Sequence, residues 1–131
     1  MNLIALQIKT SPNFQDNLNH MKDLINSCEE DSLILAPELA LCGFSYTRMQ
    51  EASDFSIKAI EELKNISINK IIALTLITKE NSGFFNTLYI LHNQEIIHTQ
   101  SKTRLFPLGN ETDYFQAGSE DDIKILNING I

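Results

Sequence analysis

Basic side chains are scarce in this 131-residue sequence: 10 lysines and arginines stand against 17 aspartates and glutamates, which gives a net charge of −7. No basic patch could release phosphate counterions, which argues against nucleic-acid or anionic-membrane partners. No apolar run is long enough to cross a bilayer. The N-terminal residues 1–5 lack the basic region and the cleavage site of a signal peptide. We therefore expect a soluble cytoplasmic protein.

Cysteine is also sparse. Cys28 and Cys42 do not make a disulfide framework. The three histidines have no metal-ligand spacing with one another or with the cysteines, so we expect no metal site. What the chain does have is 43% hydrophobic residues, enough for the core of one ordinary domain.

The first part of the chain has the pattern of a strand, a helix and a second strand. Residues 3–8 and the buried run 33–36 predict the strands. Asn13 can cap the helix, with Asp16 at the third helical position. The apolar stripe of this helix consists of Leu18, Met21, Leu24, Ile25 and Cys28. This order favours a right-handed crossover between parallel strands.

The middle of the chain predicts a second helix and three further strands. Ser53 can cap a helix that runs to about residue 65, with Ile57, Ile60 and Leu63 on its buried side. Residues 70–78 are nearly all apolar, which suits a central strand covered on both faces. Strands at 84–91 and 95–99, joined by the short turns 81–83 and 92–94, are expected to be antiparallel.

This element order indicates an α/β fold with a mixed sheet and helices on one face. The other face would need cover, from missing residues or from a second copy of the chain. Residues 123–128 predict a last strand, and Asn129-Gly130 is a hairpin turn signal. Because only Ile131 follows, we expect an incomplete domain that stops in mid-fold.

Two charged residues directly follow predicted strands. Pro37 ends the first apolar run, and Glu38 then lies at its mouth among apolar neighbours. A charge there is costly to bury unless it has a cationic partner. Lys102 follows the strand at 95–99 and opens a long, aromatic-rich loop at 101–118. If the two strands share a sheet edge, the side chains can meet. Otherwise Lys102 is a solvated loop lysine and the chain a purely structural α/β domain.

Three sequence blocks resemble the nitrilase superfamily of carbon–nitrogen hydrolases. Ala36-Pro37-Glu38 with Gly43-Phe44 is similar to the family's Pro-Glu block. The segment Asn86-Thr87-Leu88-Tyr89, followed by Ile96-Ile97, resembles its Asn-Ser/Thr strand. The third block resembles the family's lysine block and comprises Lys102, Leu105, Phe106, Pro107, Glu111, Tyr114, Phe115 and Gly118. The resemblance spans the chain but only the N-terminal half of a typical member.

The resemblance implies a four-layer α-β-β-α sandwich and hydrolysis of a small amide, nitrile or N-carbamoyl substrate by a Cys-Glu-Lys triad. Glu38 would be the general base, Lys102 the oxyanion stabiliser and Glu111 a second glutamate beside the lysine. Alternatively, Glu111 simply forms a structural ion pair with Lys102 or Arg104. The family needs no cofactor or metal and tends to form homodimers or larger assemblies.

Phe44, Tyr46 and Tyr114 are candidates for the substrate pocket, although packing explains them equally well and Tyr114 is better suited to anchoring the loop.

The nucleophile block of the family is missing here. It would follow a glycine that Gly130 resembles, and we interpret Cys42 as a packing residue and Cys28 as a core residue. The 131-residue chain is therefore expected to be inactive by itself, either as a fragment or as the product of an interrupted reading frame. The alternative is a catalytically inactive pseudoenzyme or binding module that keeps the fold.

Overall fold

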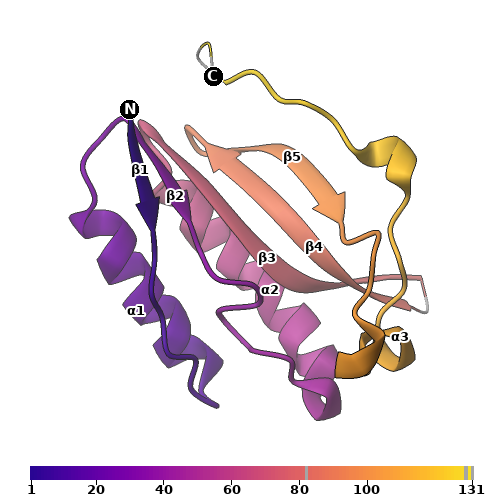
Figure 1. Ribbon diagram of the computed structural model, residues 1–131. Coiled ribbons are helices and arrows are strands. Elements are labelled where there is room, and N and C mark those ends of the chain that lie inside the picture. The colour runs from indigo at the N-terminus through magenta and orange to yellow at the C-terminus, as the bar shows by residue number, and fades with distance from the viewer. Residues whose placement is uncertain (82, 129, 131) are drawn as a thin grey trace.

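Five strands form one mixed sheet in the order β1-β2-β3-β4-β5 (Figure 1). The computed structural model describes residues 1–81, 83–128 and 130. The strands are Asn2–Ala5, Ser32–Leu35, Lys70–Glu80, Gly83–His92 and Glu95–Ser101. The pairs β1–β2 and β2–β3 are parallel, whereas β3–β4 and β4–β5 are antiparallel. The predicted mixed sheet is confirmed, although β1 begins and ends earlier than the predicted 3–8.

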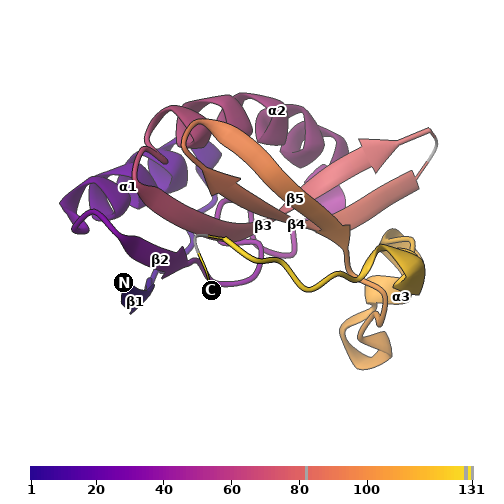
Figure 2. The ribbon, with the colours of Figure 1, turned by 90° about the horizontal axis from the view of Figure 1, so that it is seen from above.

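Two helices, α1 (Phe14–Ser27) and α2 (Met49–Asn65), cover one face of this sheet (Figure 2). The predicted cap of α1 is confirmed, since the side-chain oxygen of Asn13 accepts from the Asp16 amide at 3.0 Å. The two helices and the sheet share one core. Its fully buried members include Leu18, Met21, Ile25, Ala59, Leu63, Ile34, Ile72 and Leu91.

The predicted start of α2 at Ser53 is wrong. A 3-10 turn at Tyr46–Arg48 leads directly into the helix, which begins at Met49, and the Ser53 hydroxyl donates to the Gln50 carbonyl at 3.0 Å instead of capping. The predicted burial of Ile60 and Leu63 is confirmed. The full buried stripe consists of Met49, Ala52, Ser53, Ser56, Ala59, Ile60 and Leu63. Ile57, which was expected to be buried, is 69% exposed.

The central strand β3 is buried along most of its length, as predicted. The register places Leu3 beside Leu33, and Ile4 beside Ile34. Ile4 and Ile34 belong to the core under the helices, so the Leu3 row lies on the opposite face. Leu3 is 71% exposed there, and Leu35 on the same face is also exposed. The run 33–36 is therefore buried on one face only.

The last predicted strand is wrong. Residues 120–122 form a 3-10 turn, Glu120–Asp122, and residues 123–128 follow without strand structure. Ile125 is fully exposed. An apolar run becomes a strand only when a neighbour completes its hydrogen-bond ladder, and 123–128 has none among the described residues.

Two predicted turns fall partly outside the described residues. The hairpin signal at 129–130 includes Asn129, and the turn at 81–83 includes Ser82, and neither residue is described. No helix in the described ranges is both long and apolar enough to cross a bilayer.

Candidate active site

Glu38 lies in the turn that follows the carboxyl end of β2. Pro37 ends the strand, and the chain then reverses with Leu39 and Gly43 at positive φ of 49° and 63°. The Leu39 amide donates to the Thr75 hydroxyl at 2.8 Å, which fixes this turn against the central strand. The Glu38 carboxylate is thus held at the end of the sheet rather than inside it.

Lys102 directly follows β5 and is fixed through its own backbone. Its amide donates to the Asn86 carbonyl at 2.8 Å, and its carbonyl accepts from the Gly118 amide at 2.9 Å. Its ammonium donates to Oε1 of Glu38 and to Oε1 of Glu111, each at 2.8 Å. The structure therefore brings together Glu38 and Lys102, the two charged residues that follow predicted strands. The alternative interpretation, in which they lie apart, is wrong.

Glu111 opens the one-turn helix α3 (Glu111–Tyr114) and is only 2% exposed. A carboxylate this buried is costly unless it is paired and hydrogen-bonded. Its Oε1 accepts from Lys102, and its Oε2 accepts from the Phe106 amide at 2.7 Å. Of the two expected partners, Lys102 is the one it contacts, whereas Arg104 lies 3.9 Å from Glu120.

The two carboxylates keep Lys102 charged. Partial burial on its own would lower the pKa of this lysine, but the hydrogen bonds to Glu111 and Glu38 outweigh that effect and raise the pKa above its usual value. At neutral pH the site therefore holds a fixed ammonium between two carboxylates.

A cavity of about 600 Å³ opens beside this ammonium. Its lining consists of Glu38, Phe44, Tyr46, Lys102, Arg104, Leu105, Phe106, Gly109 and Glu111. Tyr46 donates to the Gly109 carbonyl at 2.6 Å. Tyr114 is not part of the lining; its ring stacks on that of Tyr46 with the centroids 4.1 Å apart. The loop is anchored by the buried Phe115.

Comparison with known proteins assigns the family. The profile of the carbon–nitrogen hydrolase family matches residues 3–130. The chain belongs to the carbon–nitrogen hydrolase family. The predicted resemblance is thereby confirmed, and with it the mixed α/β fold.

One relative of this carbon–nitrogen hydrolase family member is a 2-oxoglutaramate amidase from Bacillus subtilis, 32% identical over 96 residues, which are 70% of this chain and 37% of that protein. A glutamine-dependent NAD(+) synthetase from Cytophaga hutchinsonii shares the fold with a TM-score of 0.76 and 18% identity, over 98% of this chain and 24% of the synthetase. An amidase mutant from Nesterenkonia sp. has a TM-score of 0.75 and 21% identity, over 89% of this chain and 48% of the amidase. In that amidase the active-site cysteine carries the acetamide moiety of fluoroacetamide. The chain thus spans less than half the length of these relatives.

Neither cysteine of this family member contacts the Glu38–Lys102 pair in the described part of the chain. Cys42 is buried in a second core cluster with Leu39 and Ile77, and its thiol contacts the Gly43 carbonyl at 3.3 Å. Burial raises the pKa of the Cys42 thiol to about 11. The packing role predicted for Cys42 is confirmed. Cys28 is half-buried at the end of α1, where its thiol contacts the Leu24 carbonyl at 3.2 Å.

Asn86 is a member of the site to which the sequence analysis gave no role, although it begins the second block that resembles the family. It lies within β4, is 1% exposed, and its side-chain amide donates to Oε1 of Glu38 at 2.7 Å. The available signal was an amide side chain inside an otherwise apolar strand, a position where a polar group needs a partner.

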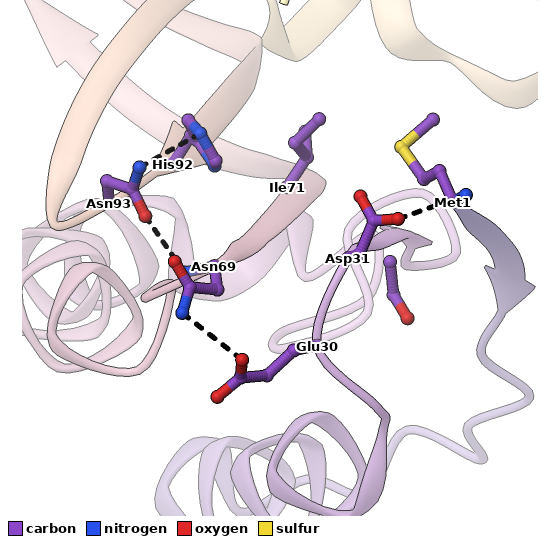
Figure 3. A pocket seen from close by; sticks show the side chains of 8 residues that line it. Met1, Glu30, Asp31, Asn69, Ile71, His92 and Asn93 are labelled. Atoms are coloured by element: carbon purple, nitrogen blue, oxygen red, sulfur yellow. Dashed lines mark hydrogen bonds and ion pairs between the residues drawn. The ribbon is translucent and has the colours of Figure 1, made fainter. Parts of the chain in front are cut away.

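A second cavity, of about 450 Å³, lies at the other end of β2 and β3 and is lined by Glu30, Asp31, Asn69, His92 and Asn93 among others (Figure 3). Its polar groups pair with one another: the Asn69 side chain donates to Glu30 at 3.2 Å, and the Met1 ammonium lies 3.1 Å from Asp31. These contacts tie neighbouring turns together.

Proposed function

We propose that this chain supplies the acid–base part of a carbon–nitrogen hydrolase site. The observation that carries the proposal is the 2.8 Å contact between Lys102 Nζ and Glu38 Oε1 at a cavity. The substrate class is a small amide, nitrile or N-carbamoyl compound. The names of the B. subtilis and Nesterenkonia relatives, both amidases, favour an amide.

In the proposed reaction, Glu38 takes the proton of a cysteine thiol, because the thiolate is the form that attacks an amide carbon. The carbonyl electron pair moves onto oxygen, and the Lys102 ammonium stabilises this oxyanion. When the tetrahedral intermediate collapses, protonated Glu38 returns its proton to the departing ammonia and a thioester remains. Glu38 then deprotonates a water, whose oxygen attacks the thioester carbon. The carbon–sulfur bond breaks and the acid is released, and protonated Glu38 returns its proton to the departing thiolate, which regenerates the thiol.

Glu111 has a supporting role in this proposal. Its buried carboxylate holds Lys102 from the side opposite Glu38 and is itself held by the Phe106 amide. Phe44 and Tyr46 would contact the substrate beside Glu38, since both line the cavity. Tyr114 would act through its stack on Tyr46.

The nucleophile is proposed to come from residues outside this sequence. Cys42 is buried and its pKa near 11 is unsuited to a thiolate nucleophile, while Cys28 is at the end of α1. The chain on its own would then be an incomplete domain without amidase turnover. No cofactor enters the proposed reaction.

We further propose that the protein forms a homo-oligomer. The open sheet face that exposes Leu3 and Leu35 needs cover, which residues outside this sequence or a second copy of the chain would supply. The cytoplasmic location and the lack of nucleic-acid partners stay predictions from composition.

The test is to react fluoroacetamide with the Glu38→Gln variant of the longest polypeptide encoded in frame with residues 1–131 and to locate the adduct by mass spectrometry. The variant is used because the adduct of the Nesterenkonia amidase was seen in a mutant in which a glutamate is replaced by glutamine. We expect the acetamide group on a cysteine other than Cys28 and Cys42. An adduct on Cys42 would show that the nucleophile is wrongly assigned. No adduct at all would reject the enzyme in favour of the inactive binding module.

A further inference from the structure

The two oxygens of the Glu38 carboxylate have different surroundings. Oε1 accepts two hydrogen bonds, from Lys102 Nζ at 2.8 Å and from Asn86 Nδ2 at 2.7 Å. Within the described residues, Oε2 accepts none. The side chain is 42% exposed and lines the cavity, so Oε2 is the oxygen left open to an incoming group.

Asn86 is well placed to maintain this difference. The residue is 1% exposed within β4, opposite the buried Ile77 of β3, so its side chain has little room to move. Its backbone carbonyl accepts from the Lys102 amide at 2.8 Å. Asn86 therefore contacts Glu38 through its side chain and fixes the backbone of Lys102 through its backbone carbonyl.

The orientation of the Asn86 amide is set by the carboxylate. An amide turned the other way would direct its carbonyl oxygen at a carboxylate, with no proton between the two acceptors. In the observed orientation Oδ1 is buried without a hydrogen-bond partner among the described residues. Leaving a buried acceptor unpaired is costly, and the hydrogen bond that Nδ2 donates to the charged Glu38 offsets that cost in the observed orientation.

We propose that Asn86 is a positioning residue that holds Oε1 of Glu38 and thereby assigns proton transfer to Oε2. This inference rests on the proposed function, because it names the oxygen that would act as base. The proton from the thiol goes to Oε2, and the same oxygen later returns it to the leaving ammonia. Asn86 itself takes no proton and touches no reacting atom.

The contact is tested without any turnover by nuclear magnetic resonance of the chain as it stands. During an acid titration, the side-chain amide signals of Asn86 are expected to follow the protonation of Glu38. In the variant Glu38→Gln this response should disappear. Asn86 signals that ignore the titration, or that respond equally in Glu38→Gln, would overturn the proposal and leave the proposed function untouched.

The positioning role is tested in the in-frame polypeptide by ammonia release from a small amide. Asn86→Leu is expected to lower kcat by about 10²-fold, the loss typical of a misplaced catalytic group, with KM nearly unchanged. The matched control is Thr87→Val on the opposite face of β4, which removes hydroxyl contacts to Thr78 and Ser101 and should leave kcat unchanged.

Each outcome of the kinetic test has one meaning. A kcat in Asn86→Leu equal to that of the unmodified protein would overturn the positioning role, even if the nuclear magnetic resonance titration shows the contact between Asn86 and Glu38. An equal loss in Thr87→Val would show that the effect is merely structural, which also overturns it. An unmodified polypeptide without turnover would reject the proposed function, and the assignment of Oε2 would be lost with it.

Discussion

At the scale of single residues, Glu111 is the group in the site that relies most on a charged partner. Its carboxylate is almost fully buried. Among the described residues, Lys102 is its one charged partner and the Phe106 amide is its other donor. Breaking a buried ion pair costs more than the pair contributes, because the remaining charge is left in a poor solvent.

Lys102→Met should therefore destabilise the chain. We expect a loss of about 3 kcal/mol in the free energy of unfolding, at the lower end for a broken buried pair because Lys102 is partly exposed. Urea unfolding followed by circular dichroism measures it. In the double variant Lys102→Met/Glu111→Gln most of the loss should be recovered, since no charge remains buried. Losses that simply add would contradict this account of Glu111.

Cys42 carries a prediction about pH. Its pKa near 11, against a usual value of 9.0, means that the thiolate forms only well above neutral pH. At pH 8 its alkylation by iodoacetamide should be slower than that of an unperturbed thiol by about 10²-fold, the ratio of the two thiolate fractions. Peptide mapping over time measures this rate, with Cys28 as the internal comparison. Cys42 reacting at the rate of a free thiol would contradict the assigned burial.

Much of the site could be predicted at this scale, but not all of it. Glu38 and Lys102 each follow a predicted strand, so their meeting needed only a shared sheet edge. The contact of Asn86 depends on the β3–β4 register and on the turn after β2, which no local pattern specifies. The distinction between Oε1 and Oε2 is likewise a property of the assembled sheet.

At the scale of elements, the features that neighbouring residues determine could be predicted from the sequence, whereas the features that tertiary contacts determine could not. The α1 cap involves only Asn13 and the amide of Asp16, three residues away, so the sequence contains the whole interaction. The start of α2 depends on the preceding 3-10 turn. The side of α2 that is buried depends on how the helix packs against α1 and the sheet. The run 123–128 has strand composition, but a strand is a pairing and its partner is not in the sequence pattern.

The observed phase of α2 gives a prediction. Ile60→Ala should cost about 2–4 kcal/mol, because it removes a buried side chain from the core. Ile57→Ala, three residues earlier in the same helix, should change stability by less than about 0.5 kcal/mol because the side chain is exposed. Denaturant unfolding of the matched pair measures both. Equal losses would favour the stripe first expected from the sequence.

At the scale of the whole molecule, the two faces of the sheet differ. Helices α1 and α2 cover one face (Figure 2), whereas the other exposes apolar side chains of β1 and β2. The chain itself contributes one helical layer and one sheet, which are two layers of the expected four-layer sandwich. The mixed sheet could be predicted from the order of apolar runs, while the cover of its open face could not.

The proposed homo-oligomer is tested on this open face. Replacing Leu3 and Leu35 together by lysine should shift the chain toward the monomer in sedimentation velocity, because charge on both copies disfavours burial of the face. Ile57→Lys adds a charge on the helical side and should leave the oligomeric state unchanged. A chain that is monomeric before any substitution would contradict the proposal.

The central claim is that Glu38 is the base of a carbon–nitrogen hydrolase site, and its most direct test is ammonia release from a small amide by the in-frame polypeptide. Glu38→Gln keeps the shape of the side chain and should reduce turnover by at least about 10²-fold, as expected when a general base is lost. Glu51→Gln, which removes an exposed carboxylate paired with Arg48, should leave turnover unchanged. Full turnover in Glu38→Gln would contradict the account.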